Sequence, residues 1–146
     1  MTSTPTPEHL GAIARRMSRL AGVYKNAAAQ LVAAQPDEPH SPAVAIVYRS
    51  CVPYITSGAS ALDAAAARIA EAAAIEVAPL IPAASPIASS TVFADTAHIL
   101  YEALQEATEL AEEVGDTRLT GDTHPYGDVI YGICLPYLLQ AAEETS

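Results

Sequence analysis

Residues that favour β-strands are scarce in this chain. Its 146 residues include no Trp and a single Phe, Phe93. Aromatic and β-branched residues favour strands, whereas alanine, which is abundant here, is the best helix former. The composition therefore predicts an all-α protein.

Basic residues and cysteines are also few. Seven Lys and Arg stand against seventeen Asp and Glu, which gives a formal net charge of −10. Such a chain repels phosphates, which argues against direct binding to nucleic acid or to an anionic membrane surface. The polar N-terminus lacks the apolar core of a signal peptide, and two isolated cysteines fit a reducing compartment. We therefore expect a cytoplasmic protein.

No apolar run is long enough to cross a bilayer. The most apolar stretch, 43–55, is interrupted by Arg49 and Pro53, and the run 129–139 is far shorter than the roughly 20 residues required. The whole chain, 1–146, has the length of a single domain with its own core. We therefore expect one helical domain that does not span a membrane.

Apolar residues recur with helical spacing in four segments. The pattern predicts helices near 8–34, 43–74, 91–115 and 128–143, with a proline-rich crossover over 76–90. The apolar stripe of the first segment consists of Leu10, Ala14, Met17, Ala21, Tyr24, Ala28 and Leu31. The stripe of the third consists of Phe93, Ala97, Leu100, Leu104, Ala107, Ala111 and Val114. The second and fourth segments contain Pro53 and Pro136, which predict a kink or break because proline lacks an N–H and clashes with the preceding turn.

An internal repeat is the strongest feature of the sequence. Residues 42–55 align without gaps with residues 125–138, at an offset of 83. The identical pairs are Pro42/Pro125, Tyr48/Tyr131, Cys51/Cys134, Pro53/Pro136 and Tyr54/Tyr137. The same offset carries the first apolar stripe onto the third. We interpret this as a duplicated helical hairpin, with halves at about 8–75 and 91–143, and predict a four-helix bundle with a pseudo-two-fold axis.

The residues shared by both copies have two interpretations. They are either core packing, or the lining of a polar ligand pocket near the pseudo-two-fold axis made of Tyr48, Cys51, Tyr54, Tyr131, Cys134 and Tyr137. In either case the duplication predicts equivalent environments for each pair of tyrosines and for the two cysteines. We expect both cysteines to be buried, since no base or positive neighbour is evident that would make them reactive.

An acidic corner follows the third predicted helix. The segment 110–116 ends in Glu112, Glu113, Val114, Gly115 and Asp116, and a polar loop leads from it to Asp128. This resembles part of the motif pair of the MazG-like all-α nucleoside triphosphate pyrophosphohydrolases, in which a Glu-Glu-x-x-Glu helix motif and a later Glu-x-x-Asp motif hold Mg²⁺. The resemblance covers about residues 104–140. It implies metal ligands at Glu109, Glu112, Glu113, Asp116 and Asp128.

The match to that family is partial. Pro125 stands where the second motif has its Glu, and Asp116 replaces the last Glu of the first motif. The position equivalent to Asp128 in the first copy is Ala45, so the first copy lacks the acidic site. The leading expectation is therefore a small acidic helical module without a cofactor, which acts through a protein partner and forms a homodimer, because its apolar content of 51% is high for one small core. The alternatives are a Mg²⁺-dependent nucleotide hydrolase and an acidic protein that imitates nucleic acid.

Overall fold

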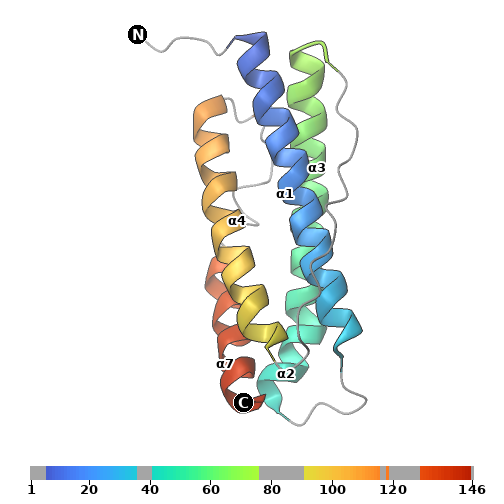
Figure 1. The fold of residues 1–146 in the computed structure, drawn as a ribbon, viewed down its shortest axis with the longest axis vertical. Coiled ribbons are helices and arrows are strands. Elements are labelled where there is room, and N and C mark those ends of the chain that lie inside the picture. Colours follow the sequence, from blue (N-terminus) through green and yellow to red (C-terminus); the bar gives the residue numbers. More distant parts are fainter. Residues whose placement is uncertain (1–5, 36–40, 76–90, 116–117, 119–128, 146) are drawn as a thin grey trace.

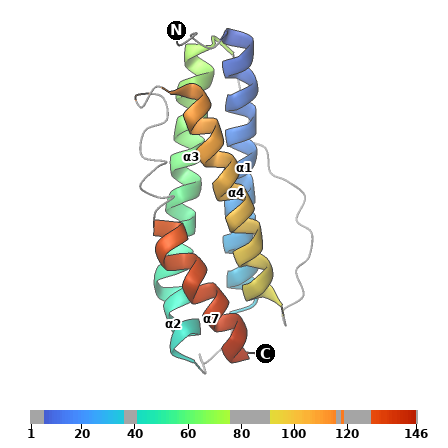
Figure 2. The ribbon, with the colours of Figure 1, turned by 90° about the vertical axis from the view of Figure 1, so that its left-hand side faces the viewer.

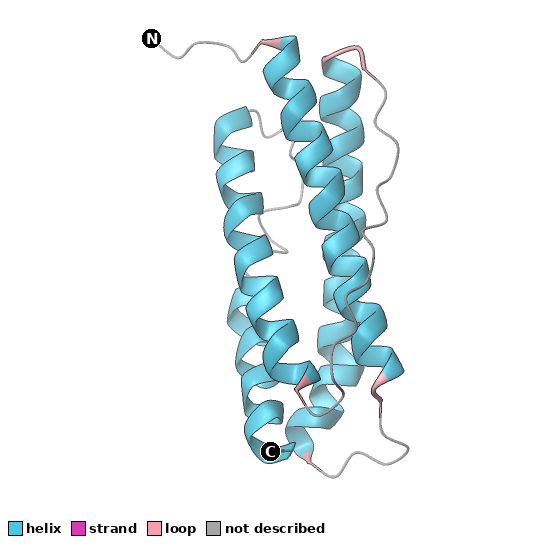
Figure 3. Ribbon diagram, in the orientation of Figure 1, coloured by secondary structure: helices cyan, strands magenta, loops and turns pink. Residues whose placement is uncertain are grey.

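The chain folds into helices throughout the part that the structure describes. In the computed structural model this part comprises residues 6–35, 41–75, 91–115, 118 and 129–145, and it contains no β-strand (Figure 3). The elements are α1 (Pro7–Ala33), α2 (Pro42–Ile46), η1 (Val47–Cys51), α3 (Val52–Ala72), α4 (Val92–Val114), η2 (Ile130–Cys134) and α7 (Leu135–Thr145). The prediction of an all-α fold is confirmed.

The helix ends follow local sequence signals. Thr6 and Ser41 each precede a proline, and their hydroxyls accept hydrogen bonds from the backbone N–H groups of His9 and Val44 at 3.2 and 3.1 Å. Side-chain caps of this kind, followed by proline in the first turn, are strong start signals. At the other end of α4, Gly115 has a φ of 69°, a left-handed conformation that glycine adopts without strain. These signals explain why the predicted boundaries of these helices lie within two residues of the observed ones.

The helices pack into an antiparallel bundle. α1 runs alongside α3 for most of its length, and α4 lies on the other side of α1, antiparallel to it (Figure 1). α7 packs against α4 and against α2, and it occupies one end of the bundle only (Figure 2). The predicted helical bundle is therefore observed, with two helical hairpins. The first hairpin consists of α1 and the continuous helix α2–η1–α3, and the second consists of α4 and the helix η2–α7.

The core consists of small and aliphatic side chains. Of the two predicted stripes, only Leu10, Leu104 and Ala111 are half-buried, and the other members are buried. Alanine is frequent in this core, which lets the helices approach closely. Among the described residues, no helix is long and apolar enough to cross a membrane.

The two helical prolines do not break their helices. Instead, each follows a π-helical turn: the N–H of Val52 donates to the carbonyl of Val47, and the N–H of Leu135 donates to the carbonyl of Ile130. Pro53 and Pro136 are the residues immediately after these two donors. A wider turn gives the proline ring room beside the preceding carbonyls, so the helix continues. Each widened turn ends two residues before its proline.

Candidate functional site

The two π-helical turns meet inside the bundle. η1 and η2 pack against each other, and each ends in a cysteine. Cys51 and Cys134 are both 0% exposed, as expected from the sequence. The Sγ of Cys134 donates a long hydrogen bond of 3.9 Å to the backbone carbonyl of Cys51. The fold thus brings together two thiols that lie 83 residues apart, one from each hairpin.

The two thiols affect each other's ionisation. The Cys134 thiol beside it lowers the pKa of the Cys51 thiol, because a nearby donor stabilises a thiolate. The Cys51 side chain, together with burial, raises the pKa of the Cys134 thiol above its usual range. Cys51 is therefore the thiol that loses its proton first, and Cys134 is the one that keeps it.

A buried phenol lies beside this thiol pair. Tyr24 of α1 is 2% exposed, and its ring lies so close to Gly58 of α3 that a Cβ there would be 3.2 Å from Cε2. Burial raises the pKa of Tyr24, and the nearby Cys134 raises it further. The phenol therefore stays protonated and can act as a hydrogen-bond donor at this position.

Thr96 of α4 supplies a second buried hydroxyl. It is 0% exposed, and its Oγ1 has no hydrogen-bond partner among the described residues. Three residues before it, the ring of Phe93 contacts Tyr48 of η1, with centroids 6.3 Å apart. Five residues after it, the ring of Tyr101 contacts Tyr131 of η2, with centroids 6.5 Å apart. Thr96 is therefore level with the two π-helical turns.

Neither hydroxyl was predicted as part of the site. Tyr24 belongs to the predicted core stripe of α1, but no sequence signal links it to Cys134. Thr96 lies three residues after Phe93, a spacing that places both on one face of a helix. This spacing from a predicted core residue is the one sequence signal that indicates burial of Thr96.

The four tyrosines of the proposed pocket differ in their exposure and in their contacts. Tyr48 is half-buried and its hydroxyl donates to the carbonyl of Leu31 at 2.6 Å. Tyr131 is 61% exposed, Tyr54 is 37% exposed, and Tyr137 is half-buried. Of the six residues predicted to line a pocket, the structure brings together Cys51 and Cys134 in the interior.

The expectation that Tyr48 and Tyr131 occupy equivalent environments is wrong. Tyr48 reaches the end of α1 at Leu31, and the position 83 residues after Leu31 is Val114, the last residue of α4. Tyr131 instead contacts Tyr101, thirteen residues before Val114 in the sequence. The physical reason is a different alignment of the paired helices in the two hairpins, so the same residue meets a different part of its neighbour.

The acidic corner is only partly described. Glu109, Glu112 and Glu113 are all exposed on α4, while Asp116 and Asp128 lie outside the described residues. Within the described part of the chain, no group of three or more His, Cys, Asp or Glu could hold a metal ion. No family model, curated protein or solved structure matches this chain. The resemblance to the MazG-like hydrolases therefore rests on its sequence motif alone.

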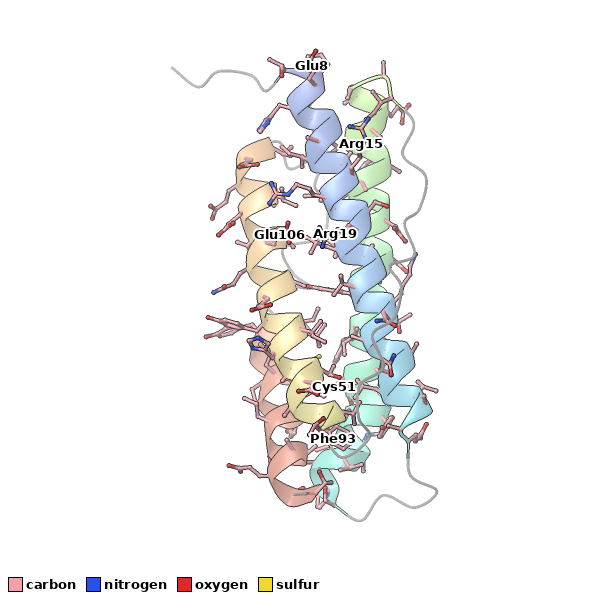
Figure 4. All side chains as sticks on the ribbon, viewed as in Figure 1. Glu8, Arg15, Arg19, Cys51, Phe93 and Glu106 are labelled. Carbon is pink, nitrogen blue, oxygen red and sulfur yellow. The ribbon has the colours of Figure 1, made fainter. Side chains whose placement is uncertain are left out.

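Charged side chains cluster on α1 and α4. Arg16 donates to Glu106 at 3.0 Å, and His9 lies 3.8 Å from Glu113 (Figure 4 labels Glu106). Arg15 and Arg19 of α1 are exposed as well (Figure 4). One carboxylate of α4, that of Glu106, is thus paired with the Arg16 cation of α1, and an exposed ion pair of this kind adds little stability.

Proposed function

We propose that this chain is a small helical interaction module whose partner is a second copy of itself. Support comes from an exposed apolar strip where α4 meets η2–α7. We call it the tyrosine seam and define it as Tyr101, Tyr131 and Leu139, which are 41%, 61% and 54% exposed. Tyrosine is enriched at protein interfaces because it combines a large apolar ring with a polar tip.

The three residues lie on one side of the second hairpin. The rings of Tyr101 and Tyr131 are already in contact across the two helices. Leu139 follows Tyr131 by eight residues, a separation that spans the widened turn and one ordinary turn and so returns to the same side. His98 and Glu102, which pair at 3.2 Å, are highly exposed on α4 next to Tyr101. An apolar centre with a polar rim is the usual anatomy of an interface.

The charge of the chain restricts where a second copy can approach. Two chains that each carry a formal charge of −10 repel one another over most of their surfaces. A two-fold dimer needs a patch that complements itself, and an uncharged pair of rings meets this condition. The tyrosine seam is therefore the surface at which two copies can approach with the least repulsion.

Sedimentation equilibrium of the full chain tests this proposal. We expect a mass of twice 15.2 kDa at high micromolar concentration, and tighter association when added salt screens the repulsion. Tyr131→Ala should shift the chain to monomer, while Tyr54→Ala, at an exposed tyrosine of α3, should leave the dimer intact. A monomer at high concentration in both low and high salt would refute self-association.

The two alternative functions have less support from the site. A Mg²⁺-dependent nucleotide hydrolase would release phosphate or pyrophosphate from a nucleotide panel, and Glu112→Gln and Glu113→Gln would abolish that release. An acidic protein that imitates nucleic acid would need an unbroken negative face, but Glu106 is paired with Arg16 of α1. The nucleotide assay therefore separates the hydrolase from the other two functions, and the distribution of acidic side chains over the surface separates the mimic from the interaction module.

A further inference from the structure

The thiols of Cys51 and Cys134 are potential metal ligands as well as packing groups of the core. Both sulfurs are sealed from water, although each could bind a metal ion after losing its proton. Their hydrogen bonding is weak, because the Sγ of Cys134 lies 3.9 Å from the carbonyl oxygen that it faces. A metal ion bound by the two sulfurs would therefore replace only a weak hydrogen bond.

One unused hydroxyl lies at the same level of the bundle, and a buried phenol lies near Cys134. The hydroxyl of Thr96 is buried without a partner among the described residues, and such a group costs stability unless an acceptor arrives. The phenol of Tyr24 lies near enough to Cys134 for a charge there to affect it. Thiolates are far better acceptors than thiols. A thiolate would thus offer the Thr96 hydroxyl an acceptor that it lacks while both cysteines are protonated.

The number of ligands restricts which ion can bind. Zinc and iron–sulfur sites need three or four protein ligands, and within the described residues no third His, Cys, Asp or Glu joins the pair. Copper(I) is a soft cation that prefers thiolates and accepts two of them in a linear arrangement. Its charge also offsets one of the two negative charges that the interior would otherwise hold alone.

We propose that Cys51 and Cys134 form a buried two-coordinate site for copper(I), with the hydroxyls of Thr96 and Tyr24 as donors to the sulfurs. In the binding step two S–H bonds break and two S–Cu bonds form. Two protons leave to solvent, no electron is transferred, and the site carries a net charge of −1. The π-helical turns position the ligands, because each turn ends in the cysteine that binds. This inference is independent of self-association.

Titration of the reduced full chain with copper(I), without oxygen and against a chromophoric copper(I) chelator, tests the site. We expect one copper per chain, close to two protons released per copper at neutral pH, and two sulfur scatterers in X-ray absorption. Cys51→Ser and Cys134→Ser should each lower the affinity by more than about a hundredfold, since each removes one of only two ligands. The monomeric Tyr131→Ala variant should bind copper as well as the unmodified chain does.

Thr96→Val separates a metal site from simple core packing. The change should lower copper affinity by about ten- to hundredfold, as loss of a second-shell hydrogen bond does, and should leave the apo protein as stable or more stable. Thr108→Val on the same helix, whose hydroxyl donates to the carbonyl of Leu104, should change neither affinity nor copper stoichiometry. The proposal is overturned if the chelator removes all copper, if a serine variant retains it, or if Thr96→Val leaves the affinity unchanged. Formation of a disulfide with a small disulfide oxidant, without copper retention, would also overturn it.

Discussion

The two hairpins share a local backbone feature but differ in how their helices meet. Each has a π-helical turn that ends in a buried cysteine and is followed by proline two residues later. In the first hairpin, however, the turn leads into the 21 residues of α3, whereas in the second it leads into the 11 residues of α7. The shared sequence thus specifies the local turn and the burial of the cysteine. The placement of the turn along its neighbouring helix depends on the rest of each hairpin.

Core truncations at equivalent positions compare the packing of the two hairpins. Ile55 and Leu138 are 83 residues apart and both are 0% exposed. Ile55→Ala and Leu138→Ala should each lower the free energy of unfolding by about 2–5 kcal/mol in urea denaturation, since each leaves a cavity. Val32→Ala, at an exposed position of α1 outside the tyrosine seam, is the control and should change it by less than about 0.5 kcal/mol. A loss at Leu138 as small as that of the control would mean that α7 is only loosely held.

A glycine in the first hairpin tests the contact between the two hairpins. A Cβ at Gly58 would lie 3.2 Å from Cδ1 of Ile130 in η2 and from the ring of Tyr24. Gly58→Val should therefore cost about 1–3 kcal/mol through overpacking. Gly132→Ala is the matched control, because nothing lies within 4 Å of its Cβ position, and it should gain up to about 1 kcal/mol. Equal effects at the two glycines would contradict the close approach of η2 to α3.

The pH dependence of stability tests the buried phenol of Tyr24, which has no counterpart in the second hairpin, where the equivalent position is Ala107. The folded chain raises the pKa of Tyr24 above its usual value of 10.0. The unfolded chain therefore loses this proton first, so the stabilisation is complete below pH 10 and falls as the pH rises above it. Above pH 10, the free energy of unfolding should therefore decrease less steeply in Tyr24→Phe, by up to about 1.4 kcal/mol per pH unit. Urea denaturation under reducing conditions on either side of pH 10 measures it, and an identical slope in the variant would contradict burial as the cause.

The tyrosine hydroxyls give the smallest expected difference. Tyr48→Phe removes the 2.6 Å hydrogen bond to the carbonyl of Leu31 and should cost about 1 kcal/mol. Tyr131→Phe should change the stability by less than about 0.5 kcal/mol, because this side chain is mostly exposed. Thermal melting of both variants measures the difference. Equal losses would show that the two tyrosines are more alike than their contacts suggest.

The helices could be predicted from the sequence because local signals determine them. Thr6–Pro7, Ser41–Pro42 and Gly115 mark helix ends without reference to the rest of the chain. The buried cysteines could be predicted too, since free cysteine behaves as a small apolar group. Their direct contact could not, because it depends on how η1 and η2 pack.

Long-range alignment explains the features that the sequence did not reveal. Whether the hydroxyl of Thr96 finds a partner depends on which groups α4 faces, and a single sequence does not contain that information. The exposure of Tyr131 depends similarly on where α7 lies along α4. The π-helical turns could not be predicted, because α-helical and π-helical hydrogen bonding have almost the same residue preferences. A proline shows only that regular helical hydrogen bonding is disturbed near it.

The π-helical turns also affect how the length of this chain can change. A residue added to or removed from a regular α-helix rotates everything beyond it by about 100°, which would turn a core face towards solvent. A π-helical turn already holds one residue more than the α-helical turn it replaces. Deletion of Ser50 within η1, combined with Pro53→Ala to remove the ring that needs the wider turn, would therefore convert the turn to regular helix and keep the phase of α3. The turns at Val47–Cys51 and Ile130–Cys134 are the two places in the described helices where the chain can lose a residue without losing the phase of its core.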